Sequence, residues 1–347
     1  MARKPDTELR RGWTTGACAT AATRAALKVL WGEGRADRVR ITLPRGERPV
    51  FEIAHWGDGP GWVEAGVVKD AGDDPDVTHG ALVVARVSAS AGGVRFSAGE
   101  GVGHVTRPGL PIAPGEPAIN PVPRQMMVQT VQEMAKRLSQ SPDIAIEIAI
   151  PGGAEIAEKT WNPRLGIKGG LSILGTTGIV RPFSCAAWIA SIHRGIDVAR
   201  AEGLSHVAGC TGATSEKTVQ ALYGLPDHAM LDMGDFVGGM LKYLARHPIE
   251  RITVGGGIGK LTKLAQGARD LHSGRSQVNF EKLSDVLGVP EVKNMNTALE
   301  VYEKTGKKHS QWVAENALIE VRKLVPKSEV DVIVMDRQGN IIAKAGP

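Results

Sequence analysis

Three glycine-containing segments in the second half of the chain each follow a short apolar run. They are Gly209-Cys210-Thr211-Gly212-Ala213-Thr214, Asp232-Met233-Gly234-Asp235 and Gly255-Gly256-Gly257-Ile258-Gly259. A glycine turn that opens a helix can bind an anion or a nucleotide, and a carboxylate after a strand can accept hydrogen bonds from a ribose diol. The predicted nucleoside-binding residues are Gly209, Thr211, Gly212, Thr214, Asp232, Gly234, Asp235, Gly255, Gly256, Gly257 and Gly259.

Each of these segments also has a structural interpretation. The glycines can serve a tight strand-to-helix connection, Asp235 can cap the following helix, and Thr214 can be a helix N-cap. The third segment matches no strict phosphate-binding motif. A P-loop needs glycine where Val254 stands and Ser or Thr where Leu261 stands, and Lys260 replaces the last glycine of GxGxxG.

The stretch from Lys69 to Gly80 carries four carboxylates within seven residues, Asp70, Asp73, Asp74 and Asp76. They repel one another unless cations or amide donors compensate them. An EF-hand register fails, because His79 stands at position six when the count starts at Asp74. Composition favours a solvated loop of Asx turns, and the functional alternative is an acidic wall facing a cationic ligand. Candidate acid–base residues are Asp70, Asp74 and His79.

Basic side chains recur within the Gly/Pro-rich loops. The planar guanidinium group of arginine is well shaped to bind carboxylates. As a set they can line a pocket for a polyanion. The predicted substrate-binding residues are Thr14, Thr15, Arg107, Arg124, Arg164, Lys168, Arg181 and Lys260. The nine histidines show no metal-binding spacing and the three cysteines form no CxxC pair, so no metal site is predicted.

The first half of the chain has the pattern of an α+β sheet domain. An Ala-rich helix is expected over residues 17–30 with Thr15 as its N-cap. A second helix is expected over residues 124–138, after a loop that spans residues 99–123. The expected strands lie at residues 39–43, 50–54, 62–68, 81–87 and 143–150.

The second half alternates strands with helices, which is typical of a Rossmann-like parallel α/β domain. A first helix is expected over residues 186–202. The strand and helix pairs that follow are 206–209 with 215–223, 229–232 with 236–246, and 251–254 with 260–271. Two further helices, 297–304 and 311–324, precede a hairpin that turns at Gln338-Gly339. We place the domain boundary near Gly178, giving domains 1–178 and 179–347.

Composition excludes several classes of protein. A length of 347 residues with 42% apolar residues indicates two folded domains rather than disorder. The net charge is +5, but the basic residues are scattered and aromatic residues make up only 4%, so we expect an anionic small molecule rather than nucleic acid. The longest uncharged stretches are too short for a membrane span, and the start of the chain has no signal-peptide core. A cytoplasmic protein without membrane contact is expected, and a homo-oligomer is allowed.

Several long segments resemble one family. They are Gly12–Ala19 (GWTTGACA), Lys69–Gly80, Gly101–Pro123 (GVGHVTRPGLPIAPGEPAINPVP), Asn162–Ser184 (NPRLGIKGGLSILGTTGIVRPFS) and Gly255–Ala265. The family is the cobalt-precorrin-5B C(1)-methyltransferases of the CbiD type, from anaerobic cobalamin biosynthesis. The likeness spans about residues 9–285. This sequence departs from the family pattern at Trp13 and Ala17, and it has glycine where many members have a histidine within Gly255–Gly257.

The resemblance implies methyl transfer from S-adenosylmethionine to ring carbon C-1 of cobalt-precorrin-5B, with cobalt carried by the substrate. It also implies a two-domain chain with a Rossmann-like C-terminal part. We therefore expect the donor in the second domain and the anionic tetrapyrrole in the first. Two alternatives stay open: a phosphoryl-transfer enzyme that uses the Gly-rich turns, and a non-catalytic protein that binds a tetrapyrrole or another polyanion.

Overall fold

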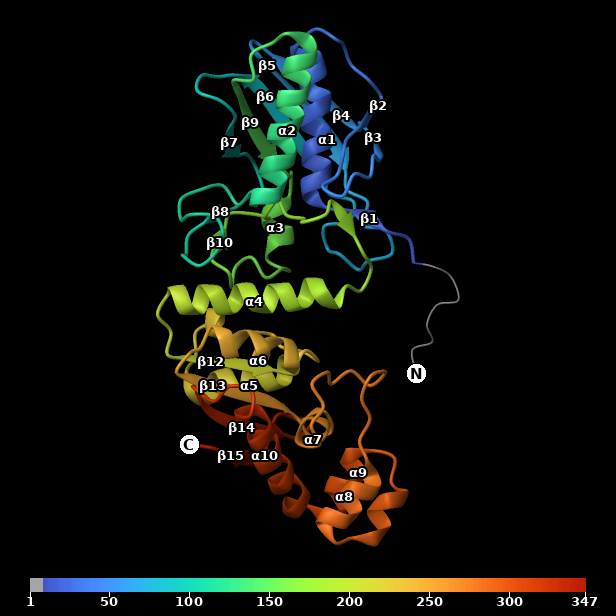
Figure 1. Cartoon of the computed structure of the whole chain (residues 1–347), viewed down its shortest axis with the longest axis vertical. Coiled ribbons are helices and arrows are strands. Elements are labelled where there is room, and N and C mark those ends of the chain that lie inside the picture. The colour runs from blue at the N-terminus through green and yellow to red at the C-terminus, as the bar shows by residue number, and fades with distance from the viewer. Residues whose placement is uncertain (1–8) are drawn as a thin grey trace. The chain divides into compact units, whose positions relative to one another are not determined.

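The computed structural model describes residues 9–347, and the chain divides between Ser184 and Cys185 into two units (Figure 1). We call them the N-terminal unit and the C-terminal unit and describe each by itself. The sequence predicts a boundary near Gly178, and the observed division falls a few residues after that position. Both units mix helices with sheets, which confirms the expected α/β and α+β fold class.

The N-terminal unit is built on a five-stranded sheet in the order β4-β5-β6-β9-β7. The strands are antiparallel except for β7, which pairs parallel with β9. Two-stranded ribbons join β1 to β11, β2 to β3 and β8 to β10. The strands are β1 (Gly12–Trp13), β2 (Arg38–Arg40), β3 (Val50–Glu52), β4 (His55–Gly59), β5 (Trp62–Val68), β6 (Leu82–Ala89), β7 (Arg95–Ala98), β8 (His104–Val105), β9 (Ile144–Ala149), β10 (Ile167–Lys168) and β11 (Ile179–Val180).

Three helices complete this unit: α1 (Thr15–Leu30), α2 (Pro121–Leu138) and the short α3 (Gly153–Ala157). Figure 1 shows α1 and α2 side by side over the sheet. The buried residues of α1 are mostly small, with alanine the commonest among them, so its backbone packs closely against both the sheet and α2. The core between them includes Met127 and Val131 of α2 and the isoleucines on one face of β9. The alternation of Ile144, Ile146 and Ile148 therefore predicts the buried face of β9 correctly.

The expected N-cap of α1 is wrong by one residue. Thr14, not Thr15, is the cap: it has an extended backbone, and its Oγ1 accepts a hydrogen bond from the amide of Ala17 at 3.2 Å. The side chain of Thr15 turns elsewhere, and its Oγ1 accepts from the amide of Leu174 at 3.0 Å. The second helix begins at Pro121 rather than Arg124, because proline is well tolerated in a first helical turn.

The C-terminal unit contains a four-stranded sheet in the order β12-β13-β14-β15. Strands β12, β13 and β14 are parallel, and the last strand, β15, is antiparallel to β14. The strands are β12 (His206–Cys210), β13 (Arg251–Gly257), β14 (Glu329–Met335) and β15 (Ile341–Ala345). The helices are α4 (Cys185–Ala201), α5 (Ala213–Tyr223), α6 (Val237–Arg246), α7 (Ile258–Ala265), α8 (Phe280–Leu287), α9 (Ala298–Thr305) and α10 (Lys307–Arg322), with 3₁₀ turns η1 (Asp227–Ala229) and η2 (Pro290–Asn294).

Two expected elements of this unit are wrong. Residues 229–232 form no strand: a 3₁₀ turn occupies Asp227–Ala229, and one parallel bridge joins Met230 to Ala208 of β12. Asp232, at φ +33°, ends the extended backbone. The helix expected over 260–271 ends at Ala265, because Gly267 has φ +95°.

The sequence predicts only part of a small helical insertion: the helix expected over 297–304 matches α9, whereas α8 and η2 are missed. Helix α8, turn η2 and helix α9 pack around a separate apolar cluster of Leu283, Leu287, Val292 and Val301. The Gly/Ser-containing segment before Phe280 reads as loop and hides the start of α8. Among the described residues, no helix is both long and apolar enough to cross a membrane.

Candidate functional site

The carboxyl ends of β12 and β13 lie side by side in the C-terminal unit. Cys210 pairs with Gly255, and the Thr211 amide donates to the Gly255 carbonyl at 3.0 Å. After β12 the chain crosses to Met230, on the side of β12 away from β13. After β13 the chain continues to β14, on the opposite side. The connections therefore diverge between β12 and β13, and open α/β sheets bind ligands at such a point.

The glycines at this edge fall into two groups. In the first group packing excludes a side chain. A Cβ on Gly209 would lie 2.3 Å from Met240 Sδ, one on Gly255 2.6 Å from Val219 Cγ2, and one on Gly256 2.7 Å from the Thr211 side chain. Gly255, Gly256 and Gly257 belong to β13 itself rather than to a turn, which corrects the expected geometry of this segment.

The second group comprises Gly212, Gly257 and Gly259, where an added Cβ would meet nothing within 4 Å. None of the three has a positive φ that favours glycine; Gly257, for example, has φ −70°. Neither backbone conformation nor packing within the chain therefore requires glycine at these positions. All three lie where β12 ends or α7 begins, so they leave the backbone open to a close ligand.

Lys260 ties the three predicted segments together. Its Nζ lies 3.0 Å from Asp235 Oδ1 and donates to the Thr211 carbonyl at 3.0 Å. Asp235 does not cap α6, whose N-cap is Phe236 and has no side-chain hydrogen bond. Lys260 is also a predicted substrate-binding residue, and that role stays a prediction beside these contacts with Asp235 and Thr211.

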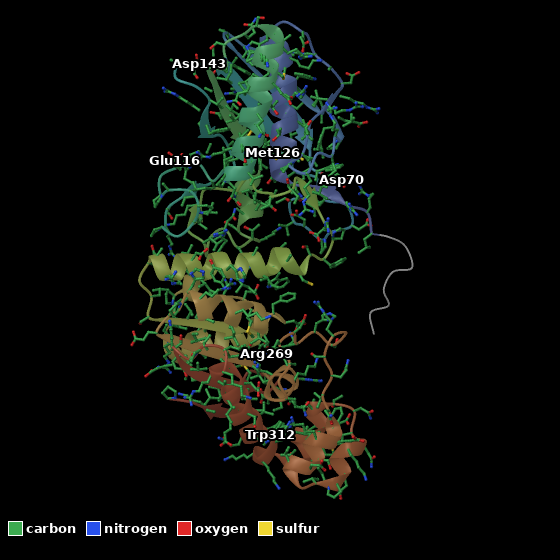
Figure 2. The ribbon with its side chains drawn as sticks, in the orientation of Figure 1. Asp70, Glu116, Met126, Asp143, Arg269 and Trp312 are labelled. Atoms are coloured by element: carbon green, nitrogen blue, oxygen red, sulfur yellow. The ribbon has the colours of Figure 1, made fainter. Side chains whose placement is uncertain are left out.

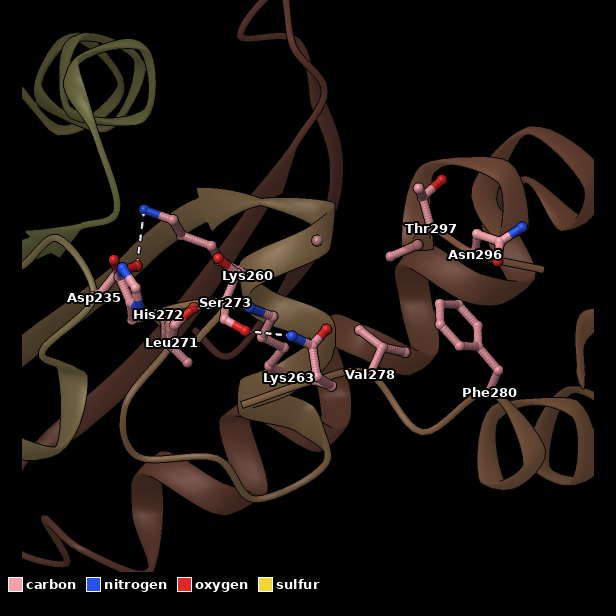
Figure 3. A pocket seen from close by; sticks show the side chains of 13 residues that line it. Asp235, Lys260, Lys263, Leu271, His272, Ser273, Val278, Phe280, Asn296 and Thr297 are labelled. Atoms are coloured by element: carbon pink, nitrogen blue, oxygen red, sulfur yellow. Dashed lines mark hydrogen bonds and ion pairs between the residues drawn. The ribbon is translucent and has the colours of Figure 1, made fainter. Parts of the chain in front are cut away.

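A pocket of about 380 Å³ opens beside the first turn of α7 (Figure 3). Asp235 and Lys260 lie at one side of it, and Phe280, Asn296 and Thr297 lie at the other. Three predicted residues line it: Asp235, Gly259 and Lys260. The lining residues that sequence reasoning missed are Lys263, Leu271, His272, Ser273, Gln277, Val278, Phe280, Asn296, Thr297 and Ala298.

Lys263 lines this pocket and links two segments of its wall. Its Nζ donates to the Leu271 carbonyl at 2.9 Å, which ties α7 to the segment that follows it. Burial lowers the pKa of this ammonium group, while the charge of Asp235 acts in the opposite direction. Lys263 lies on α7, and the other missed lining residues follow Ala265, where the helix expected over 260–271 in fact ends.

The other predicted nucleoside-binding residues lie at the same sheet edge but outside the pocket. Gly234 has φ +56°, so its backbone favours glycine. Asp232 has a left-handed backbone, and its carbonyl accepts a hydrogen bond from Trp188 Nε1 at 3.0 Å. Thr214 faces the hairpin between β14 and β15, where an added Cβ on Gly339 would lie 3.0 Å from its methyl group.

Basic side chains and backbone amides of the N-terminal unit neutralise carboxylates of the acidic loop, residues 69–80. Lys69 is 2% exposed, and its Nζ donates to Asp76 Oδ2 at 2.6 Å. Both terminal guanidinium nitrogens of Arg10 donate to the carboxylate of Asp70, a residue labelled in Figure 2. Asp73 accepts the amide of Arg10 at 2.6 Å. These contacts fit the structural interpretation of the loop better than a wall that faces a cationic ligand.

The three candidate acid–base residues differ in how many of their proton-accepting atoms already take part in hydrogen bonds. A hydrogen bond from Arg10 holds the pKa of Asp70 below its ordinary value, which makes it a weaker base. The Nδ1 atom of His79 accepts the Ala71 amide at 3.1 Å, so its lone pair is occupied. Asp74 accepts the Phe183 amide at 2.7 Å through one carboxylate oxygen. A catalytic role for any of them stays a prediction.

The predicted substrate-binding residues of the N-terminal unit also separate into groups. Arg124 is held by the Ile119 carbonyl at 2.8 Å and the Pro117 carbonyl at 3.1 Å. Thr14 and Thr15 are buried around the start of α1. Arg164 lies over the Trp161 ring at 5.4 Å, and the side chain of Arg107 covers Gly166. Two cations, Lys168 and Arg181, are exposed and make no ion pair with any described residue.

Among residues 9–347 no three His, Cys, Asp or Glu side chains gather closely enough to hold a metal ion. Cys18, Cys185 and Cys210 form no disulfide with any described residue. Burial raises the pKa of Cys18 to about 12. That thiol is therefore protonated at neutral pH and is a poor nucleophile.

Fold and site together define a class: an α/β protein whose Rossmann-like unit has a glycine-lined edge at the carboxyl ends of two parallel strands, where open α/β sheets bind ligands. A family model described as CbiD matches residues 2–182. Cobalt-precorrin-5B C(1)-methyltransferase of Brucella anthropi is 57% identical over 353 residues, covering 97% of this chain and 96% of that protein. The protein of the same name from Paramagnetospirillum magneticum is 56% identical, covering 97% and 98%. The chain belongs to the CbiD family.

A crystal structure of cobalamin biosynthesis protein (cbiD) from Archaeoglobus fulgidus is also similar. It shares 28% sequence identity with this chain, with a TM-score of 0.43, and the match covers 77% of this chain and 83% of that one.

Proposed function

We propose that the protein methylates C-1 of cobalt-precorrin-5B with S-adenosylmethionine as donor, giving cobalt-precorrin-6A and S-adenosylhomocysteine. One observation carries this proposal: relatives named for that reaction match the chain at 56–57% identity over 97% of its length. The glycine-lined edge of the C-terminal unit supports the choice of donor. No feature of the site favours phosphoryl transfer.

The donor is assigned to the carboxyl ends of β12 and β13 and to the pocket beside α7. Gly212, Gly257 and Gly259 let the adenosyl group approach the backbone, because a Cβ added at each would meet no atom of the described residues within 4 Å. The pocket offers Asp235 as an acceptor for the ribose diol. The free N–H groups at the start of α7 suit the donor's carboxylate.

In the reaction, an electron pair from the ring carbon forms the new carbon–carbon bond. The pair of the broken sulfur–methyl bond stays on sulfur, so the sulfonium becomes a neutral thioether. An acid paired closely with the sulfonium would stabilise the ground state more than the transition state and slow the reaction. The carboxylates therefore belong at the ribose. In-line alignment of the ring carbon, the methyl group and the sulfur lowers the activation free energy by on the order of 7–11 kcal/mol when the geometry is good.

The N-terminal unit, taken by itself, offers cations to an anionic ligand. Lys168 and Arg181 are its exposed cations from the predicted set, and they suit the carboxylate arms of the substrate. Cobalt arrives with the macrocycle, so the protein needs no resident metal for this step. Asp74 is the candidate base we retain, because one of its carboxylate oxygens has no partner among the described residues. We place the reaction in the cytoplasm, where cysteines that form no disulfide stay reduced.

Incubation of the full-length protein with S-adenosylmethionine labelled in its methyl group and cobalt-precorrin-5B tests the proposal. We expect NMR to locate the label on ring carbon C-1 and chromatography to find S-adenosylhomocysteine in equal amount. Label on another atom, or no transfer while a CbiD relative is active in the same assay, would contradict the proposed function.

A further inference from the structure

Trp188 on α4 is a large aromatic side chain that is both exposed and rigidly held. Its exposed fraction is 46%. Its Nε1 donates to the Asp232 carbonyl at 3.0 Å, and the ring edge lies 3.4 Å from the place where a Cβ on Gly234 would be. Burial cannot explain a tryptophan whose ring is fixed by a hydrogen bond yet left open to solvent, and such residues commonly mark binding surfaces.

Two further side chains extend this surface. The Phe236 ring centroid lies 6.1 Å from that of Trp188, with the planes tilted by 54°. The guanidinium carbon of Arg275 lies 5.8 Å from the Phe236 centroid. Arg275 is anchored by Asp270 at 2.8 Å and is still 45% exposed. We call Trp188, Phe236 and Arg275 the aromatic platform.

The platform adjoins the proposed donor pocket along two segments. Asp235 lines the pocket, and the next residue, Phe236, belongs to the platform. His272 and Ser273 line the pocket, and Arg275 follows them in the same loop. The Leu271 amide donates to the Asp235 carbonyl at 2.9 Å, which holds the two segments together. A molecule on the platform would therefore lie next to a donor in the pocket.

From these contacts we propose that the aromatic platform binds a face of the macrocycle during methyl transfer and that Arg275 pairs with one of its carboxylate arms. This inference rests on the proposed function. A tetrapyrrole-derived ring is broad and unsaturated with apolar faces, which suits contact with Trp188 and Phe236. Its rim is anionic, which suits a guanidinium group held in place by Asp270. The platform is thus a positioning surface for the acceptor, distinct from the donor pocket.

The test separates acceptor binding from donor binding in the full-length protein. In Trp188→Leu we expect the KM for cobalt-precorrin-5B to rise about tenfold, as loss of a good aromatic contact would produce. The Kd for S-adenosylhomocysteine should change less than about twofold. Trp188→Phe should restore most of the acceptor affinity, and Arg275→Gln should raise the KM for the acceptor alone. Leu222→Ala is the control, because Leu222 is also 46% exposed and lies on α5 of the same unit.

The outcomes distinguish this inference from the proposed function. If the acceptor KM of Trp188→Leu equals that of the wild type, the platform does not bind the macrocycle, even though methyl transfer itself stands. The inference also fails if donor and acceptor constants worsen in parallel with a lowered melting temperature, which is the mark of a packing role. If the wild type transfers no methyl group, the proposed function has failed and the platform assignment fails with it.

Discussion

Lys260 Nζ lies 3.0 Å from Asp235 Oδ1, so a residue in the first turn of α7 is paired with the acidic segment before α6. The same nitrogen donates to the Thr211 carbonyl at 3.0 Å. Segments that are far apart in the sequence are thereby fixed at one sheet edge before any ligand arrives. A site fixed in this way loses less entropy when it binds.

Substitution of glycines at this edge should separate packing from ligand binding. Gly259→Ala should leave the melting temperature unchanged or slightly higher, because the added Cβ meets nothing within 4 Å and alanine favours a helix. The Kd for S-adenosylhomocysteine should rise on the order of tenfold, as the methyl group enters the pocket. Gly255→Ala is the contrast: its Cβ would lie 2.6 Å from Val219, and we expect a loss of about 1–3 kcal/mol in stability. Scanning calorimetry and titration calorimetry measure the two effects. Unchanged affinity in Gly259→Ala would contradict the assignment.

The two carboxylates of the acidic segment should contribute unequally to donor binding. Asp235→Asn should weaken S-adenosylhomocysteine binding about tenfold, because Asp235 lines the pocket and the amide is a weaker acceptor for a ribose diol. Stability should fall by about 1 kcal/mol or less, since the pair with Lys260 is partly exposed. Asp232→Asn serves as the matched variant and should have the smaller effect. A larger loss in Asp232→Asn would move the ribose away from the pocket.

His309 should make stability depend on pH. The side chain is fully buried, its Nδ1 has no hydrogen-bond partner among residues 9–347, and burial lowers its pKa from 6.5 to about 4. The unfolded chain therefore binds this proton more readily than the folded chain. The stabilisation is complete above about pH 6.5 and is lost as the pH falls toward 4, with a loss of about 2 kcal/mol at pH 5.

Urea unfolding at pH 7.5 and pH 5 measures this effect. His309→Leu should be less pH-dependent than the wild type by that amount. The comparison isolates His309 from His206, whose pKa burial also lowers. Equal pH dependence in the two proteins would show that His309 is not neutral and buried as described.

The buried ion pair of the acidic loop should be structural. Lys69→Met leaves the Asp76 carboxylate without its cation in a site where Lys69 is 2% exposed, so we expect a loss of about 3–5 kcal/mol. Arg10→Met is the control: it removes the exposed pair with Asp70, so its loss of stability should be much smaller than that of Lys69→Met. Chemical denaturation gives both values. Similar losses in the two variants would mean that burial of Lys69 does not set the energy of its pair.

The periodic parts of the fold could be predicted from the sequence, because their patterns report burial directly. The isoleucines of β9 and the strand and helix pairs around β12 and β13 are of this kind. The segment at 229–232 was mistaken for a strand because its apolar residues are buried beside β12, although only Met230 forms a bridge there. Pattern alone does not reveal the left-handed backbone of Asp232.

The candidate site was only partly accessible to sequence reasoning. The positions of the glycines indicated the sheet edge. Sequence alone cannot show that packing requires glycine at position 255 but not at position 259. The far wall of the pocket, with Phe280 and Asn296, comes from an insertion whose start has no clear helical signal. Trp188 was unremarkable in sequence, because its exposure depends on how α4 packs against α6.

A crystal structure of the full-length protein with S-adenosylhomocysteine tests the central claim most directly. We predict that the adenosyl group lies against Gly212, Gly257 and Gly259, with its ribose hydroxyls within hydrogen-bonding distance of Asp235. Ordered density for the ligand elsewhere in the molecule, with this sheet edge and pocket empty, would contradict the account.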